Sequence, residues 1–467
     1  MDMNYTRRDC LKQMAVGTFA AACGTMPTRT LCGQEPGERP QHTAQAQDGV
    51  TVINPGGRVP LSIIVDDSTC LVNLNRFAMP QFDAAFGGTN PAYQRNWQQW
   101  PAEIPDDFVR KFADWANGHG VRGKYSIVPY PACVGRVDRL LPGWSQQALR
   151  ASLDLVRQRM MPAWDIHPEM VTHTRVIDLA TGHPYAANTR DYMENWDWTT
   201  GKSVDEMTAY LAYALQILKD AGLECEGVTT PGGFGTRARP QLAAGVLESC
   251  RSVFQTEIPH YFRDLYDGGT KSVMPRVELA SGLDGEDPRC VVSIVGCTGD
   301  WTGGWDCSLP VGADAFISPD LRSGRMIDVI ERGEPAIMVC HWTGIYFNGE
   351  ELGLQVFDQV VRRLHQRYSH LKWMKLSEIA RYWAARELTA IDKVDGIVSL
   401  HAPFACPGFT MKVAGWEDMP PQFESGVATV TFRTVTDPLQ LTSGTCCRQG
   451  NAWLVCFDLP RGASRLV

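Results

Sequence analysis

The chain has 467 residues, of which 44% are hydrophobic, and its formal net charge is −8 at pH 7. An apolar fraction of this size supports a globular core. The charge is spread along the chain without basic clusters, which argues against a nucleic-acid partner. After the N-terminal segment, no apolar run approaches the roughly 20 residues of a membrane-spanning helix. The composition therefore predicts a globular protein with one large and one small domain.

The N-terminus has the pattern of an export signal. Thr6-Arg7-Arg8 precedes a short apolar run, Met14 to Ala22, which ends in three alanines. A basic segment, a short apolar core and small residues near a cleavage point are typical of signal peptides. The segment resembles the twin-arginine class, with Cys10 where that class usually has Phe. We expect residues 1–31 to be a twin-arginine signal peptide and residues 32–58 to be a flexible linker, because large apolar side chains are scarce there.

Export would place the protein in the periplasm or outside the cell, where disulfides can form. Cys23 follows the three alanines, so cleavage as a lipoprotein is an alternative to release. The chain has 15 cysteines without a C-x-x-C pair or zinc-finger spacing, and most lie in apolar, strand-like surroundings. We therefore expect many buried free thiols, with one member of Cys446-Cys447 as a candidate for a bridge.

From about residue 60 to 385, short apolar runs alternate with amphipathic segments. The predicted strands cover residues 61–65, 124–128, 169–174, 227–230, 252–255 and 336–340. The predicted helices cover residues 106–118, 146–158, 203–221, 356–368 and 376–388. The helix at 203 begins with a capping-box pattern, Ser203-x-x-Glu206. This alternation predicts repeated βα units around a parallel sheet or barrel.

Two regions depart from this alternation. The segment from Asn73 to Trp100 is rich in aromatic and amide side chains, and we expect a loop over the rim of the sheet. Its Trp97 and Trp100 would either stack on a sugar or anchor the loop. Past about residue 390, strand-like runs at 397–400, 409–413, 428–432 and 453–457 predict a small all-β module. Packing against the main domain is its simplest role.

Candidate chemistry gathers where the predicted strands end. In parallel α/β folds, ligands collect at the C-terminal ends of the strands. Reading each strand to its end gives Asp66-Asp67, Glu169 to His173, Thr230-Pro231-Gly232 and His341-Trp342. Acids, two histidines and a Pro-Gly turn are therefore predicted to converge on one rim.

These stretches, in this order, resemble the motifs of the polysaccharide deacetylase family, which is carbohydrate esterase family four and its relatives. An apolar strand ending in Asp-Asp, a Glu-x-x-x-His strand, an x-Pro-x-Gly turn and an apolar strand ending in His match residues 63–67, 169–173, 229–235 and 337–341. The resemblance implies an α/β fold, a distorted (β/α) barrel of the polysaccharide deacetylase type, over residues 59–388. A small accessory domain like a β-sandwich would follow over residues 389–467.

The resemblance also implies metal-assisted deacetylation of a sugar or polysaccharide, with zinc as the usual divalent metal. Asp67 and His173 would be metal ligands, Asp66 the general base and His341 the acid that protonates the leaving group. Saccharide contacts are expected at Trp301, Trp305, Trp342, Pro231 and Gly232.

Two positions depart from the family pattern. The family's second histidine falls at Ile177, so His183 or His167 could supply the third metal ligand, and a site with two protein ligands is a further alternative. The arginine that usually partners the catalytic Asp is replaced by Thr229. Arg237 and Arg76 are the candidates to replace that arginine.

Two other functions stay open on the sequence. One is a catalytically inactive relative that binds carbohydrate on the same fold. The other is a glycoside hydrolase on a related barrel, which needs two carboxylates about 5 to 10 Å apart. Asp66 with either Glu169 or Asp300 would be that pair. Metal content of the purified protein separates these possibilities from a deacetylase.

Overall fold

The structure is a computed structural model, and it describes residues 49–416, 421–426 and 429–467. The predicted signal peptide, including Cys23, and most of the predicted linker lie outside the described residues. The last part of that linker is a strand: β1 (Val50–Val52) pairs antiparallel with β15 (Cys406–Ala414). Val50 and Val52 bury their side chains in an apolar core, which explains why this stretch is not a free tether.

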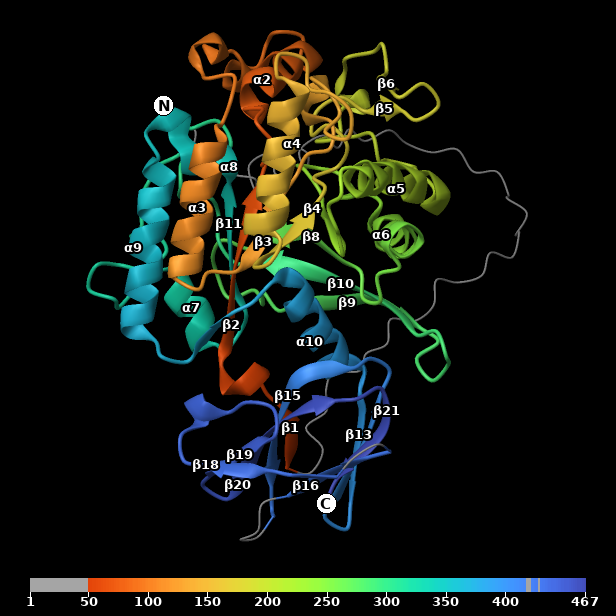
Figure 1. Cartoon of the computed structure of the whole chain (residues 1–467), viewed down its shortest axis with the longest axis vertical. Coiled ribbons are helices and arrows are strands. Elements are labelled where there is room, and N and C mark those ends of the chain that lie inside the picture. The colour runs from red at the N-terminus through yellow and green to blue at the C-terminus, as the bar shows by residue number, and fades with distance from the viewer. Residues whose placement is uncertain (1–48, 417–420, 427–428) are drawn as a thin grey trace, which may run out of the picture. The chain divides into compact units, whose positions relative to one another are not determined.

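The α/β part of the chain contains two sheets (Figure 1). In the first sheet the order is β11-β2-β3-β4, β12 pairs with the start of β2, and all neighbours are parallel. In the second the order is β7-β8-β10-β9, and β9 is antiparallel to β10. The strands of the first sheet are β2 (Val59–Asp66), β3 (Gly123–Ser126), β4 (Trp164–His167), β11 (Ala336–His341) and β12 (Leu371–Trp373). Those of the second are β7 (Gly227–Thr229), β8 (His260–Leu265), β9 (Arg276–Ser281) and β10 (Arg289–Gly296).

Main-chain contacts join these two sheets at two places. After β4, Glu169 forms a parallel bridge with Thr229 of β7, and the Thr229 N–H donates to the Pro168 carbonyl at 3.0 Å. After β10, the Cys297 N–H donates to the Ile337 carbonyl of β11 at 2.7 Å. The strand ends that carry the candidate residues are therefore connected by backbone hydrogen bonds.

Helices cover the strands, and Figure 1 shows α3, α4 and α9 along one side and α5 beside α6 on another. The helices are α2 (Leu74–Ala85), α3 (Asp106–Gly118), α4 (Gln146–Leu155), α5 (Val204–Asp220), α6 (Arg239–Phe254), α7 (Arg325–Glu331), α8 (Trp342–Tyr346), α9 (Leu352–Arg367) and α10 (Leu376–Leu388). Shorter turns of 3-10 helix lie at Pro55–Gly57, Pro91–Tyr93, Trp97–Gln99, Pro131–Cys133, Arg190–Tyr192, Phe347–Gly349 and Pro438–Gln440, and a π-helix continues α4 over Val156–Met160.

Most predicted elements of this part are present, and three predictions are wrong. Residues 252–255 are not a strand but the end of α6, where buried Val253 continues the apolar face of the helix. Residues 169–174 are not a strand either, because β4 ends at His167 and Pro168, which has no N–H to donate, follows it. The predicted loop after Asn73 begins with α2, which buries one helical face against the core.

The C-terminal region is built from two sheets of five strands (Figure 1). One has the order β1-β15-β20-β19-β18 and the other β13-β14-β21-β16-β17. Their remaining strands are β13 (Ala390–Val394), β14 (Ile397–Ala402), β16 (Gln422–Ser425), β17 (Thr429–Thr431), β18 (Arg433–Val435), β19 (Thr445–Gln449), β20 (Ala452–Leu459) and β21 (Gly462–Leu466). Because the described residues cluster as one compact unit, a domain boundary at residue 389 stays a prediction.

Helix α10 connects the two regions through a shared apolar core. Ile379 and Trp383 of α10 belong to one cluster of buried residues with Ile294 of β10 and with Phe409 and Met411 of β15. The C-terminal strands thus pack against the α/β part, as the simplest reading of their sequence predicts.

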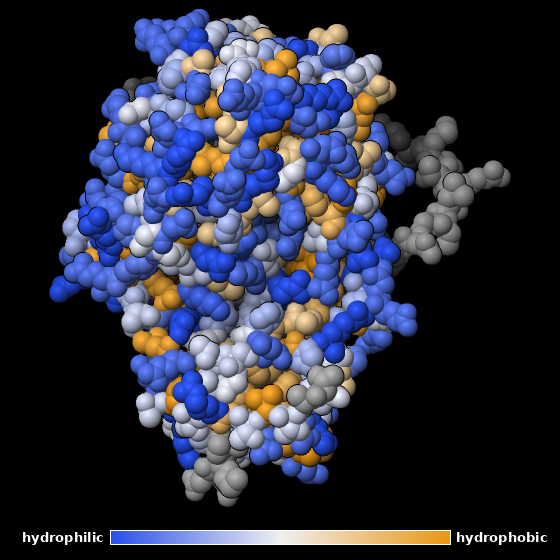
Figure 2. All heavy atoms as spheres, in the orientation of Figure 1, coloured by the Kyte–Doolittle hydropathy of each residue, from blue (hydrophilic) through white to orange (hydrophobic). Residues whose placement is uncertain are grey.

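On the face shown in Figure 2, hydrophilic residues cover most of the surface and apolar residues are scattered among them. In the part of the chain that the structure describes, no helix is long and apolar enough to cross a membrane. The twelve cysteines among these residues are all free, and ten are buried. The prediction of buried free thiols is thereby confirmed, and neither Cys446 nor Cys447 forms a bridge.

Candidate functional site

The site begins where β2 ends. Asp66 is the last residue of β2 and pairs in register with His341, the last residue of the neighbouring β11. Asp67 follows with a φ of 61°, in the left-handed region that non-glycine residues seldom adopt. The two carboxylates have different partners, Lys124 for Asp66 and His173 for Asp67, and both are buried.

Asp66 forms a fully buried ion pair with Lys124 of β3. The Lys124 Nζ lies 2.6 Å from Asp66 Oδ1 and also donates to Ser126 Oγ at 2.6 Å, and both charged side chains have no exposed surface. The sequence prediction of an arginine partner is wrong, because Arg237 pairs with Asp197 and Arg76 donates to the main-chain carbonyls of the segment 97–100. The sequence does carry a signal for this partner, because Lys124 is a lysine inside a predicted buried strand.

Asp67, Glu169 and His173 form a buried cluster whose ligand atoms all lie within 4.8 Å of one another. His173 Nε2 lies 2.8 Å from Asp67 Oδ1 and 3.4 Å from Glu169 Oε1. Glu169 Oε2 accepts hydrogen bonds from the Asp67 N–H at 2.8 Å and from Ser126 Oγ at 2.9 Å. Two carboxylates and one imidazole therefore meet at the rim of the first sheet.

The loop that carries this histidine is held by Glu194. Its carboxylate accepts hydrogen bonds from the backbone N–H groups of Val171, Thr172 and His173, and from the Tyr210 hydroxyl at 2.5 Å. The backbone of His173 has a φ of 62°, so the loop is strained at the residue that faces Asp67. A buried carboxylate with four donors compensates such a conformation. Sequence reasoning missed Glu194, whose role depends on contacts about twenty residues away.

The structure brings Glu169 to Asp67 and His173 as the third potential ligand, and it brings neither of the predicted histidines there. His183 is an exposed residue of β6 (His183–Pro184), which pairs with β5 (Ile177–Asp178) in a hairpin. His167, at the end of β4, contacts His260 in a different cluster. The chain turns after Pro168 and directs Glu169, rather than His167, toward β2. Glu169 therefore takes the place that the sequence analysis gives to a third histidine.

The donor set fits a divalent metal. Among the described residues, Asp67 Oδ2 is a buried carboxylate oxygen without a hydrogen-bond partner. Burial disfavours protonation of His173, but Asp67 and Glu169 outweigh it and raise the pKa of His173 well above its ordinary value. Burial likewise acts against ionisation of Glu169, whereas His173 and Lys124 lower its pKa. Without a metal, the imidazolium is thus the cation between two carboxylates. Carboxylate and imidazole groups are both ligands of divalent metals.

On the other side of Asp66, His341 is oriented by Asp300. His341 Nδ1 lies 2.6 Å from Asp300 Oδ2, which also accepts from the His341 N–H at 3.0 Å. Asp300 is itself fixed by the Thr302 N–H at 2.8 Å and hydroxyl at 2.6 Å. Burial acts against the charged imidazole, but Asp67 and Asp300 raise the pKa of His341 to about 9. His341 is therefore an imidazolium at neutral pH.

One of the predicted saccharide contacts is wrong. Trp342 is fully buried and packs against Phe108, Phe112 and Tyr125, so its ring cannot stack on a sugar. Trp301 and Trp305 are half-buried, with the Trp301 ring against Phe316 at 4.5 Å.

The turn after β7 has a structural role that does not depend on a substrate. Pro231 is buried, and Gly232 has a φ of 43°. A Cβ at Gly232 would lie 2.5 Å from the Asn195 carbonyl, and the Gly232 carbonyl accepts from Arg263 at 2.8 Å. A saccharide contact at this turn, as at Trp301 and Trp305, stays a prediction.

Comparison with known proteins gives matches to solved structures alone: no protein-family model and no curated protein matches the chain. A probable polysaccharide deacetylase from Pseudomonas aeruginosa PAO1 is similar with 10% identity and a TM-score of 0.39, over 70% of this chain and 91% of that one. The Puue allantoinase is similar with 10% identity and a TM-score of 0.34, over 77% and 98%. A Parabacteroides distasonis protein named for the glycoside hydrolase/deacetylase class has 12% identity and a TM-score of 0.39, over 79% and 83%. Similarities this low decide nothing about chemistry, which has to be argued from the residues of the site.

The Asp66–Lys124 pair predicts a large loss of stability when one charge is removed. Lys124→Met leaves the buried Asp66 carboxylate without its cation, so the free energy of unfolding should fall by about 3–5 kcal/mol. Urea denaturation measures this loss. The double variant Asp66→Asn/Lys124→Met buries no unpaired charge and should recover most of the stability. Equal stability of Lys124→Met and wild type would contradict the pairing.

The His341–Asp300 pair predicts a pH dependence in metal-free protein. The folded pKa of His341, about 9, exceeds its ordinary value of about 6.5, so its stabilising contribution is complete below about pH 6.5 and is lost as the pH rises through about 9. The unfolding free energies of wild type and His341→Gln should therefore differ most near pH 6 and converge above about pH 9. Urea denaturation in the presence of a chelator measures the difference. A gap that is constant with pH would exclude the raised pKa.

Proposed function

We propose that this chain is a metal-dependent hydrolase of the polysaccharide deacetylase type, which removes acetyl groups from a sugar or polysaccharide. The observation that supports it most is the buried cluster of Asp67, Glu169 and His173 beside two charged pairs, Asp66–Lys124 and His341–Asp300. A potential ligand set, a fixed carboxylate and an imidazolium thus lie at the ends of neighbouring parallel strands. This arrangement supplies the roles that hydrolysis of an acyl group needs.

In this proposal the two sheets of the α/β part close into a distorted (β/α) barrel. An accessory domain over residues 389–467 would follow the barrel. The Glu169–Thr229 bridge and the Cys297–Ile337 hydrogen bond support closure, because they connect β4 to β7 and β10 to β11. In such a barrel the C-terminal ends of the parallel strands surround one mouth. The candidate residues at the ends of β2, β4 and β11 would then face a common substrate.

The proposed metal ligands are Asp67, Glu169 and His173. When bound, a divalent cation such as zinc acts as a Lewis acid toward the acetyl carbonyl and toward water. Metal binding would displace the proton of the His173 imidazolium, since a ligating histidine is neutral. Glu194 would keep His173 in place through the backbone of its loop.

The remaining residues would move protons. Asp66, oriented by Lys124 at 2.6 Å, is the proposed base that accepts a proton from the attacking water. His341, protonated at neutral pH, is the proposed acid that donates a proton to the leaving amine or alcohol. Asp300 would orient the His341 ring and stabilise its charge.

The observed partners weigh against the two alternatives. For a glycoside hydrolase, Glu169 or Asp300 would have to be the second carboxylate beside Asp66, but His173 and His341 hold these two carboxylates in ion pairs. An inactive relative would lack a third ligand, which the family pattern places at Ile177. Glu169 restores a third ligand to the cluster and so removes the reason for that reading.

Metal content and activity test the proposed function together. Asp67→Ala and His173→Ala should each remove one equivalent of metal per chain and abolish acetate release from acetylated chitooligosaccharides and acetylxylan. His341→Ala should keep the metal and lower the rate by about 10²–10⁴-fold, because an acid adds that much to catalysis. His183→Ala is the matched control and should change neither. Elemental analysis and acetate assays give the readouts, and unchanged metal content in Asp67→Ala would refute the site.

Export through the twin-arginine route is part of the proposal, and it rests on the sequence of residues 6–22. Replacing both Arg7 and Arg8 by Lys keeps the charge and removes the guanidinium groups of the signal. The full-length variant should accumulate in the cytoplasm, whereas the wild type should appear in the periplasm or the medium. Cell fractionation with immunoblotting separates the two outcomes, and normal export of the variant would contradict the route.

A further inference from the structure

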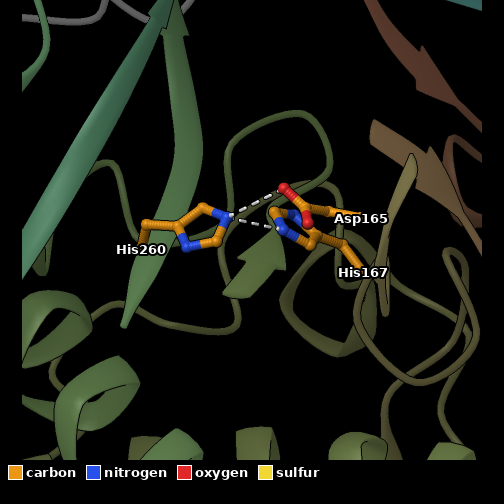
Figure 3. A group of neighbouring side chains, drawn as sticks. All are labelled: Asp165, His167 and His260. Carbon is orange, nitrogen blue, oxygen red and sulfur yellow. Dashed lines mark hydrogen bonds and ion pairs between the residues drawn. The ribbon is translucent and has the colours of Figure 1, made fainter. Parts of the chain in front are cut away.

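A second buried cluster of metal-type ligands lies within the α/β part, and it shares no residue with the proposed catalytic site. It consists of Asp165 and His167 of β4 and His260 at the start of β8. Residues two apart in a strand point to the same side, so β4 presents Asp165 and His167 together. Figure 3 shows the two imidazole rings facing each other, with the Asp165 carboxylate beside them. Both histidines have no exposed surface, and Asp165 is buried.

The ring nitrogens are close enough for one ion to bind both. His167 Nε2 lies 2.9 Å from His260 Nε2, and Asp165 Oδ2 lies 3.9 Å from His260 Nε2. Two zinc–ligand bonds of about 2.0–2.1 Å can span either of these separations. The other ring nitrogen of His167, Nδ1, lies 3.3 Å from Thr229 Oγ1. With Nδ1 held by Thr229, Nε2 is the ring nitrogen that faces His260, and an ion bound there would replace the hydrogen bond between the two Nε2 atoms.

The strand next to this cluster leaves its nitrogens uncovered. Gly227 begins β7, and a Cβ at this position would lie 2.8 Å from the Nε2 atoms of both His167 and His260. Any other residue would therefore press on the two nitrogens that face each other. The same Cβ would lie 2.5 Å from the His260 carbonyl, so glycine here permits the close approach of β7 to β8 and keeps side-chain atoms away from both nitrogens.

The charge of the cluster also favours a cation. Asp165 accepts hydrogen bonds from the Ser377 N–H at 2.6 Å and hydroxyl at 2.8 Å, at the first turn of α10, whereas the Lys375 ammonium is 4.0 Å away. A buried carboxylate is costly unless an opposite charge compensates it. Lys375 compensates Asp165 only from 4.0 Å, so a metal between Asp165 and the two rings would add a positive charge in direct contact with the carboxylate.

We propose that Asp165, His167 and His260 form a second, structural site for a divalent metal of the zinc type, which links β4, β8 and the first turn of α10. Two imidazoles and one carboxylate favour zinc over magnesium or calcium, which prefer oxygen ligands. Complete burial of both histidines separates this ion from substrate, so its effect is on stability. The inference does not depend on the proposed catalytic function.

Metal content of single variants tests the second site. Wild-type protein, dialysed against zinc and then freed of loosely held metal, should retain two equivalents per chain. Asp67→Ala should retain one, His260→Asn should retain one, and the double variant none. One equivalent in the wild type that is absent from Asp67→Ala would overturn the second site and leave the catalytic proposal intact. One equivalent that survives in Asp67→Ala and is lost in His260→Asn would support the second site and overturn the catalytic metal site.

A second measurement covers the case in which His260→Asn does not fold. In the Asp67→Ala background, cobalt(II) should give the visible absorption of a nitrogen-ligated ion, and zinc should raise the midpoint of thermal unfolding. Thr229→Val removes the contact to His167 Nδ1 and should weaken metal affinity by about 10–100-fold in this background. Thr230→Val, one residue further along, is the matched control and should leave affinity unchanged. Equal affinity in Thr229→Val, or no cobalt absorption in Asp67→Ala, would refute the site.

Discussion

The cost of burying charge is the constraint that connects the site residues of the α/β part. Asp66, Asp67, Glu169 and Glu194 are all buried, and an ionised carboxylate taken out of water costs several kcal/mol unless charges and donors surround it. These carboxylates are compensated by different groups. Asp66 pairs with an ammonium, Asp67 and Glu169 share an imidazole, and Glu194 accepts hydrogen bonds from backbone N–H groups. These partners come from β3 and from the segment after β4, so the strands must assemble before the charges are satisfied. Chemistry and folding therefore depend on the same contacts.

Backbone strain at the rim follows from this arrangement. Asp67 and His173 both have positive φ values, and each faces the other across the 2.8 Å contact between their side chains. A left-handed conformation costs a non-glycine residue about 1–3 kcal/mol, so something must hold it. Glu169 accepts the Asp67 N–H, and Glu194 accepts the His173 N–H. The two residues that would bind a metal are thus fixed by carboxylates acting on their main chain, which leaves their side chains free to point at a common centre.

What could be predicted from the sequence was set by the range of the interactions involved. Helices α3 and α5 were predicted within a residue or two because amphipathic spacing and the capping box at Ser203 are local signals. The ends of β2 and β11 were predicted because apolar runs stop at Asp66 and His341. Lys124 and Glu194 were missed as partners because their contacts join strands and loops distant in sequence. Trp342 does not lie at the rim as predicted, because helix α8 begins directly after β11 and its first side chain, Trp342, enters the core.

The position of His167 shows how one proline can divide a predicted strand between two buried side-chain clusters. As an extended strand, residues 164–173 would have alternated their side chains between two faces, and His167 would have stayed about 20 Å from His173. Pro168 ends the ladder instead, so Asp165 and His167 keep the regular alternation and face His260, whereas Glu169 leaves the strand and reaches the N–H of Asp67. The chain then curves around Glu194 and returns His173 to the same carboxylates. Four of the six residues in the two clusters, one cluster within the strands and one at their rim, thus come from a single stretch of ten residues.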